Sequence, residues 1–199
     1  MRLFVTVLLF GLCVQFSSPV YANTFESGLT AYEAGDYAHA KEVWRGLANK
    51  GDVEAQFSLG NLYATGQGVP KDYTNAVLWY RFAAEQGHVQ AQLYLGYYYS
   101  KGRGVAMSGK EALKWYTSAA EQGHVDAQYN LGALWFKGKG VSKSNVNAYV
   151  WWKVAAESGS GAAQKQLSKL TKKMLALDID EAETIAAEKL ALISERLGQ

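Results

Sequence analysis

Cysteine is nearly absent from this sequence of 199 residues. The single cysteine, Cys13, lies in an apolar stretch close to the N-terminus. A disulfide needs two thiols and a thiolate metal site needs several, so neither is expected in the rest of the chain. A cysteine nucleophile is excluded there for the same reason. The stability of the protein must then come from packing.

The chain also lacks a large excess of either charge. The 20 basic and 18 acidic residues leave a formal net charge of +2. Proteins that bind nucleic acid usually carry a clustered basic face, so no nucleic-acid partner is predicted. Proline is rare as well, with two residues against twenty glycines, whereas apolar residues make up 49% of the chain. This composition is typical of packed helices separated by glycine turns.

Long apolar runs are missing beyond the N-terminus. There, Arg2 precedes an apolar run over 3–16, and Val20-Tyr21-Ala22 has the small-x-small pattern of a signal-peptide cleavage site. We therefore expect a signal peptide over 1–22, cleavage after Ala22, a periplasmic or secreted protein, and no membrane span after cleavage. An uncleaved anchor is the alternative.

An internal repeat of 36 residues dominates the rest of the sequence. Three similar blocks open at Gly51, Gly87 and Gly123 and align without a gap. The same spacing links further identical residues: Gly60, Gly96 and Gly132; Trp79, Trp115 and Trp151; Ala84, Ala120 and Ala156. A period of this length indicates a solenoid of stacked supersecondary units.

Each repeat has the pattern of two helices. In the first copy, the apolar residues over 53–65 fall at helical spacing and predict the first helix. A glycine-rich turn follows, and Thr74 or Asn75 is suited to the N-cap of the second helix, which is expected to end at Gly87. The glycine inside each first helix predicts close approach of another helix. The recurrent tryptophans are expected to be core.

The recurring residues also resemble a known family. The pattern is Ala-Gln-x-x-Leu-Gly-x-x-Tyr/Trp, then Gly-x-Gly-Val, then Ala-x-x-Trp-Tyr/Trp-x-x-Ala-Ala-Glu-x-Gly. Over 51–158 it resembles the Sel1-like repeat, a relative of the tetratricopeptide repeat. The resemblance implies an all-α fold, a right-handed α-solenoid of antiparallel helix pairs, whose concave face binds proteins or peptides. Family members serve as adaptors and, in bacteria, as exported factors.

The segments on either side of the repeats are expected to cap the array. In the last of them, Asp178, Asp180 and Thr184 are candidate N-caps of the final helix. The predicted organisation is a signal peptide over 1–22, a tetratricopeptide-like capping helix pair over 23–50, repeats over 51–86, 87–122 and 123–158, and a degenerate capping repeat over 159–199.

Columns that vary between repeats predict the binding surface. Constant columns should hold the array together, whereas variable ones are free to face solvent or a partner. Three variable columns at i, i+3 and i+7 form one stripe along the first helix, which lines the concave face in related repeats. The predicted partner-binding residues are Ser58, Asn61, Tyr94, Tyr97, Tyr98, Lys101, Asn130 and Lys137.

The middle repeat is the most aromatic part of this stripe. Exposed tyrosines are enriched in binding hot spots, which favours Tyr94 and Tyr97 as contact residues. Tyr98 shares its column with Leu62 and Leu134. Packing of Tyr98, and also of Tyr94, between helices is therefore the alternative.

Basic residues recur in two successive turns, as Lys101 with Arg103 and Lys137 with Lys139. Stacking of the repeats would place the four charges along one rim, where they would attract an acidic partner. An ordinary solvated loop edge is the alternative.

Catalytic and metal sites are not predicted. His88 and His124 share a column and would lie one repeat apart, too far to bind one metal ion. The segment 138–143 resembles a phosphate loop but lacks the preceding strand and the full spacing. We therefore expect no enzyme activity, no cofactor and no metal.

The leading hypothesis is an exported interaction module that binds a partner protein or peptide, as a monomer or weak homo-oligomer. The alternative is a cell-wall or β-lactam-related binding protein or enzyme of the exported Sel1-repeat type. Those relatives carry disulfide-stapled repeats, which a chain with Cys13 alone does not have.

Overall fold

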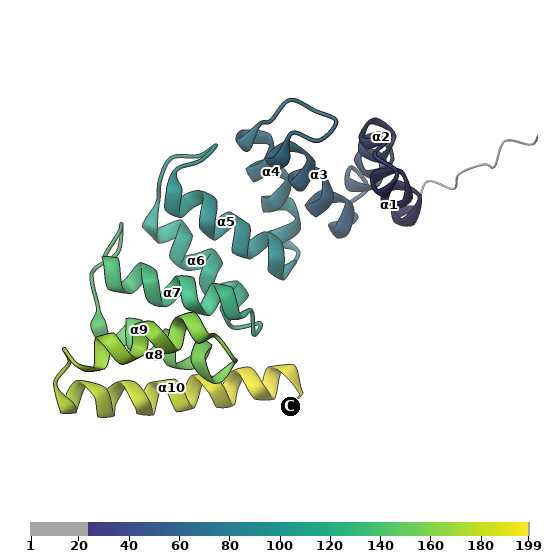
Figure 1. Ribbon diagram of the computed structural model, residues 1–199. Coiled ribbons are helices and arrows are strands. Elements are labelled where there is room, and N and C mark those ends of the chain that lie inside the picture. The colour runs from purple at the N-terminus through teal and green to yellow at the C-terminus, as the bar shows by residue number, and fades with distance from the viewer. Residues whose placement is uncertain (1–23, 199) are drawn as a thin grey trace, which may run out of the picture.

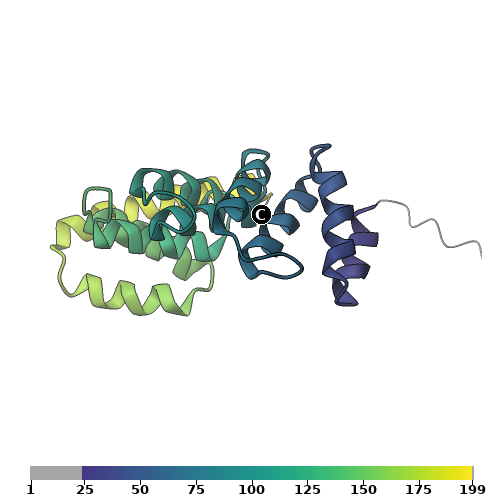
Figure 2. The ribbon, with the colours of Figure 1, turned by 90° about the horizontal axis from the view of Figure 1, so that it is seen from above.

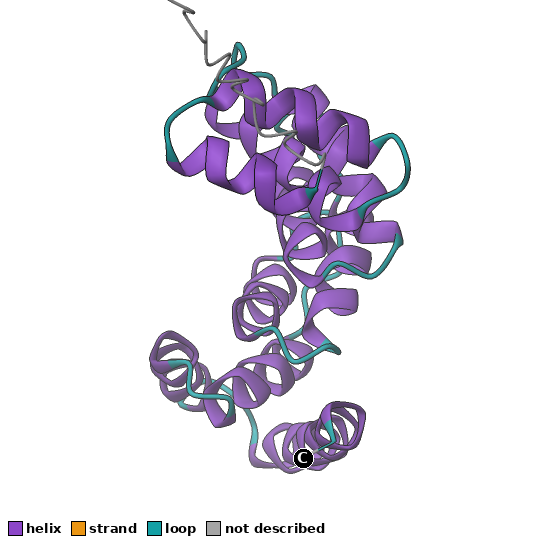
Figure 3. Cartoon of the chain, turned by 90° about the vertical axis from the view of Figure 1, so that its right-hand side faces the viewer, coloured by secondary structure: helices purple, strands orange, loops and turns teal. Residues whose placement is uncertain are grey.

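The computed structural model describes residues 24–198, and this part of the chain is entirely helical, with no strand (Figure 3). The all-α prediction is confirmed. The predicted signal segment and its cleavage site lie outside the described residues. The ten helices of this range are α1 (Phe25–Glu33), α2 (Tyr37–Ala48), α3 (Val53–Thr65), α4 (Tyr73–Glu85), α5 (Val89–Lys101), α6 (Gly109–Ala120), α7 (Val125–Lys137), α8 (Asn145–Glu157), α9 (Gly161–Thr171) and α10 (Ala176–Leu197).

The helices follow one another as packed pairs along a curved path (Figure 1). From α1 to α8 each helix packs on the next one in the chain, both within a pair and between pairs. Every unit therefore buries its apolar side against a neighbouring unit, which is the organisation of a helical solenoid. The predicted α-solenoid is confirmed. No helix within residues 24–198 is long and apolar enough to cross a bilayer.

The glycine inside each first helix lies against an aromatic ring of the second helix. A Cβ atom at Gly96 would come within 2.5 Å of the Tyr116 ring, well inside van der Waals contact. The other repeats have the same relationship, between Gly60 and Tyr80 and between Gly132 and Trp152. The predicted close approach of helices is confirmed, and its direct cause is a ring seated where a side chain would be.

The second glycine of each turn packs on the preceding repeat. Gly104 has a φ of +67°, and a Cβ there would lie 2.3 Å from the carbonyl oxygen of Tyr73. Both the left-handed backbone and the lack of space require glycine at this position. This packing brings the Arg103 side chain over the ring of Tyr73, with 5.7 Å from Cζ to the ring centroid.

The second helix of the first repeat begins earlier than predicted. Asp72 is the N-cap, and its Oδ1 accepts hydrogen bonds from the backbone N–H groups of Thr74 at 2.9 Å and Asn75 at 3.1 Å. The expectation of a cap at Thr74 or Asn75 is wrong because the preceding carboxylate already satisfies both groups. The bonds to Asn75, chiefly the backbone one, lower the pKa of Asp72.

The last helix differs from the expectation in its start and its packing. It follows Leu175, which is extended, and has no side-chain cap. The candidate caps Asp178, Asp180 and Thr184 lie inside α10, so that prediction is wrong. In Figure 2, α9 (light green, at the bottom) is set apart from α10 (yellow). The helix α10 packs mainly on α8.

The tryptophan column is only partly core. Trp115 and Trp151 are buried, and a lysine side chain lies over the ring of each. Trp79 is half-buried, and its ring makes an edge contact with the exposed Phe82. Trp79 packs against the N-terminal core cluster with only part of its surface, so the prediction that all three tryptophans are core holds in full for the second and third repeats and in part for the first.

Candidate functional site: a groove along the first helices

Three adjoining hollows lie along α3, α5 and α7, the first helices of the repeats. Their volumes are about 270 Å³ between α3 and α5, 370 Å³ between α5 and α7, and 170 Å³ beside the turns that follow α5 and α7. Tyr97 lines all three. We call this surface the groove and its parts the first, second and third hollows.

The first hollow has a wall of tyrosines. Tyr80 donates its hydroxyl hydrogen to Oδ1 of Asn61 at 2.8 Å, which fixes the amide at the edge of the hollow. Tyr98 is 7% exposed and packs between the rings of Tyr73 and Tyr80, each at a centroid distance of 5.7 Å. Burial, followed by the neighbouring Tyr73, raises the pKa of Tyr98 to about 12, so this phenol is neutral at physiological pH.

Tyr97 stands at the junction of the hollows and carries two cations. The Lys101 ammonium lies 5.9 Å and the Arg103 guanidinium 5.8 Å from its ring centroid. Arg103 also lies over Tyr73 and therefore bridges the aromatic rings of two repeats. These distances are within the range of cation–π attraction, which places two basic groups beside the aromatic centre of the groove.

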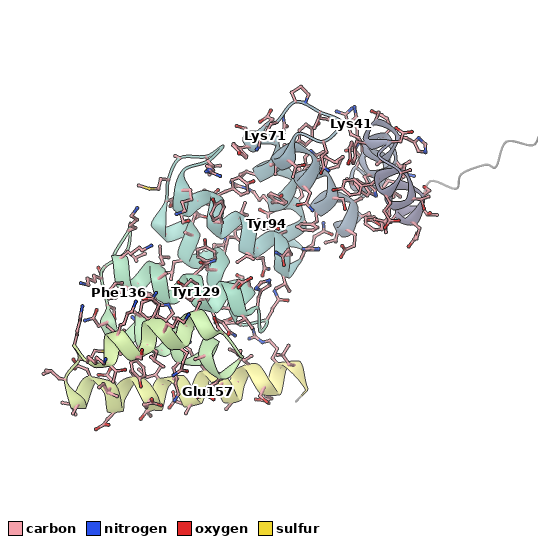
Figure 4. All side chains as sticks on the ribbon, in the orientation of Figure 1. Lys41, Lys71, Tyr94, Tyr129, Phe136 and Glu157 are labelled. Carbon is pink, nitrogen blue, oxygen red and sulfur yellow. The ribbon has the colours of Figure 1, made fainter. Side chains whose placement is uncertain are left out.

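The second hollow is lined from two successive first helices. Tyr94 and Leu93 come from α5, and Asp126, Tyr129 and Asn130 come from α7. Tyr94 and Tyr129 are labelled on these two helices in Figure 4. Asp126 is the one acidic residue that lines any of the three hollows.

The third hollow is basic. Lys101, Lys137 and Lys139 line it together with Asn130 and the buried Tyr116. Burial raises the pKa of Tyr116 to about 12, so its hydroxyl stays protonated. None of the ion pairs among residues 24–198 involves one of these three lysines. No carboxylate of residues 24–198 therefore forms an ion pair with the lysines of this hollow.

The structure brings together most of the residues of the predicted stripe and rim. The predicted residues that line the groove are Asn61, Tyr94, Tyr97, Tyr98, Lys101, Arg103, Asn130, Lys137 and Lys139. Ser58 is half-buried and lines none of the hollows. Tyr98 belongs to the wall and offers little surface to a partner, in agreement with the packed alternative for this residue.

Sequence reasoning missed several residues that line the groove, among them Tyr73, Tyr129 and Asp126. Tyr73 stands where the later repeats have Gly109 and Asn145, but it begins the second helix and so lies off the stripe of the first helices. Tyr129 shares its column with Phe57 and Leu93, so it resembled a core position. Asp126 lies in the first turn of α7, where an acidic residue already has a helix-terminal explanation.

The two repeated histidines have structural roles at the repeat junctions. His88 is the N-cap of α5, and its Nδ1 accepts a hydrogen bond from the Ala91 N–H at 3.1 Å. The His124 Nε2 lies 2.9 Å from Oε1 of Gln90 in the preceding repeat. No group of three potential metal ligands occurs within the described residues.

A further pocket of about 440 Å³ lies beside the C-terminal half of α10. Three of its charged groups take part in contacts within the chain: Arg196 Nη1 lies 3.4 Å from Oε2 of Glu121, and Lys189 lies 4.8 Å from the ring centroid of Trp151. The pocket belongs to the contact between the terminal helix and the repeats, and it is not our candidate site.

The fold and the groove define a helical-repeat scaffold of the solenoid class. The model of the Sel1 repeat matches residues 53–88, 89–124 and 125–160, more than half of the chain. The protein therefore belongs to the Sel1 repeat family. No curated protein matches the sequence.

Two solved structures are similar to the chain. A Sel1 repeat protein from Oxalobacter formigenes is 37% identical, with a TM-score of 0.66, and the match covers 72% of this chain and 59% of that one. The protein c5321, a protective antigen of uropathogenic Escherichia coli with an SLR fold, is 31% identical with a TM-score of 0.66, over 87% of this chain and 41% of that one. The chain thus spans about half of the length of these relatives.

Proposed function

We propose that the protein is an exported interaction module that holds a partner protein or peptide in the groove. The observation that carries the proposal is the position of Tyr97, which lines all three hollows and has Lys101 and Arg103 over its ring. A tyrosine gives a large contact area for little loss of side-chain entropy, and the adjacent cations add directional attraction. Sel1 repeats typically serve protein–protein interaction, which supports the same reading.

The charges of the groove favour an acidic segment as the ligand. Lys101, Lys137 and Lys139 surround one hollow, and only Asp126 opposes them elsewhere in the groove. A partner with carboxylates beside an apolar or aromatic residue would satisfy both the lysines and the tyrosines. Because exposed charges are screened by salt, such binding should weaken as the ionic strength rises.

The test is affinity capture from a bacterial envelope extract with the purified chain as bait. We expect Tyr97→Ala and Lys101→Glu each to lose proteins that the wild type retains, because each removes part of the same surface. The matched control is Lys165→Glu, which reverses an exposed charge on α9 outside the groove. If both groove variants retain the same partners as the wild type and the control, the groove is not the binding surface.

Export requires a separate measurement. We propose removal of residues 1–22 on export, because the apolar run ends in a small-x-small site at Ala22. Cell fractionation followed by N-terminal mass spectrometry should find a chain that begins at Asn23. An intact N-terminus in the membrane fraction would support a retained anchor instead.

A further inference from the structure

The outward-facing columns of the second helices differ in chemistry from repeat to repeat. The columns of Leu78 and Phe82 on α4 are occupied by Lys114 and Ser118 on α6, as expected of a water-facing surface. On α4 the two apolar side chains are 44% and 41% exposed. They lie one helical turn apart, and the Phe82 ring also contacts Trp79. An apolar pair at these columns in the first repeat therefore needs an explanation beyond stacking of the repeats.

The third repeat shows what covers this pair of columns when it is apolar. Val150 and Val154 on α8 correspond to Leu78 and Phe82, and they are only 1% and 0% exposed. Both belong to one buried cluster with Ala182 and Ala186 of α10. The chain thus buries this surface under a helix of its own.

Contacts on both sides of the valine pair come from α10. On one side, Glu183 accepts a hydrogen bond from the Tyr149 hydroxyl and lies 3.4 Å from the Lys153 ammonium. On the other side, Lys189 lies 4.8 Å from the Trp151 ring centroid. Contacts from α10 therefore lie on both sides of Val150 and Val154, and the fully buried Ala182 and Ala186 of α10 belong to the same cluster as the two valines.

The first repeat offers most of the same surface. Trp79 stands in the column of Trp151, and Arg81 stands in the column of Lys153. Arg81 donates to the Tyr99 hydroxyl, and a guanidinium has N–H donors beyond that one bond. On α4, an apolar pair, a tryptophan and a cation therefore stand at the same columns as the residues of α8 that α10 contacts.

We propose that Leu78, Trp79 and Phe82 form a docking surface for an amphipathic α-helix of a partner protein. The helix would present small residues at i and i+4 to Leu78 and Phe82, like Ala182 and Ala186 of α10, which share a buried cluster with Val150 and Val154. It would carry a carboxylate toward Arg81 and a cation toward Trp79. This surface lies outside the groove, so the proposal does not depend on what the groove binds.

The probe is a fluorescein-labelled peptide with the sequence of residues 173–198, titrated with the full chain while anisotropy is measured. We expect saturable binding to the wild type. Leu78→Lys with Phe82→Ser should weaken it at least tenfold, because the double variant installs the residues of the second repeat. Circular dichroism checks that the variant is folded. The control is the full chain with Leu175→Lys, which changes an exposed leucine away from α4 and should bind the unchanged peptide like the wild type.

Three outcomes would overturn the proposal. Absence of binding to the wild type shows that α4 does not accept such a helix. Equal binding to the double variant shows that the peptide displaces α10 from α8. If sedimentation reveals a wild-type dimer that the double variant cannot form, a second copy of the chain is the occupant. A peptide with Ala182→Glu and Ala186→Glu should fail to bind if the small residues face the surface.

Discussion

Gln122 donates a hydrogen bond from its Nε2 to Oε1 of Gln92, over 2.8 Å. The Gln92 Nε2 in turn donates to the carbonyl oxygen of Ala84 at the end of α4. The buried amide is thereby satisfied at both ends and joins the second repeat to the first. The same arrangement connects Gln86 and Gln56 one repeat earlier.

The third repeat lacks one member of this network. Gln128 is fully buried and donates to the carbonyl oxygen of Ala120, but its Oε1 has no hydrogen-bond partner among the described residues. Ser158 occupies the position that corresponds to Gln122. The side chain of Ser158 is too short to donate a hydrogen bond to the Gln128 Oε1, as Gln122 does to Gln92. A buried acceptor without a partner lowers the stability of the fold.

Ser158→Gln should therefore raise the free energy of unfolding, by about 1 kcal/mol. The backbone of Ser158 has φ −81° and ψ 9°, close to the φ −90° and ψ 7° of Gln86, so the new side chain can follow the same course. Urea titration followed by circular dichroism measures the change. Gln122→Ser is the reverse substitution and should lower stability by a similar amount; a gain from both changes would contradict the network.

The glycine at position 96 should not tolerate a methyl group. Gly96→Ala places a Cβ against the Tyr116 ring and should destabilise the protein by about 1–3 kcal/mol, as overpacking does. Gly46→Ala is the matched control because Gly46 is also helical, and no other group lies within 4 Å of the new Cβ. Helix propensity predicts stabilisation of about 0.5–1 kcal/mol there. Thermal unfolding of the two variants should shift in opposite directions.

The outward columns of α4 and α8 should respond differently to the same new residues. Val150→Lys with Val154→Ser buries polar groups beneath α10 and should cost more than about 3 kcal/mol. Leu78→Lys with Phe82→Ser changes exposed positions and should stay within about 1 kcal/mol of the wild type. Equal losses in urea titrations would mean that α10 does not cover α8 in solution.

Alkaline pH should weaken the fold through its buried tyrosines. The pKa of Tyr116 is raised to about 12 by burial, whereas an unfolded tyrosine ionises near pH 10. The folded state then binds more protons above pH 10, so stability is retained below that pH and falls as pH rises toward 12. One such group contributes a slope of at most about 1.4 kcal/mol per pH unit. Unfolding measured between pH 9 and 12 should show a shallower decline for Tyr116→Phe; an unchanged slope would contradict its assigned share.

Most of the array could be predicted from the sequence because the repeat exposes the constant columns to direct comparison. The mid-helix glycines and the aromatic residues of the second helices recur together, so the sequence indicates that the two helices of each repeat pack closely at these positions. Outside the repeat this comparison is lost. The start of α10 at Ala176 and its packing on α8 depend on tertiary contacts of Ala182 and Ala186. Alanine is common on every face of a helix, so the sequence does not show which face of α10 is buried.

The sequence predicted which residues share the stripe of the groove, but it did not predict which of them are buried. Column comparison placed Tyr94, Tyr97 and Tyr98 on one helix without showing which rings the next helix would cover. Tyr98 is buried because Tyr73 and Tyr80 flank it, and that contact depends on the Gly104 turn packing on the preceding repeat. Such contacts between repeats are not encoded in the pattern of any one helix.

The position of Tyr97 also determines how binding energies along the groove should combine. A ligand that extends over several repeats meets this one side chain in each hollow, so its segments do not act on independent sites. Substitutions made in separate parts of such a ligand should show coupling in double-mutant cycles, and the coupling should disappear in the Tyr97→Ala background. Recognition along the groove would then be cooperative, with a single aromatic ring as the shared element.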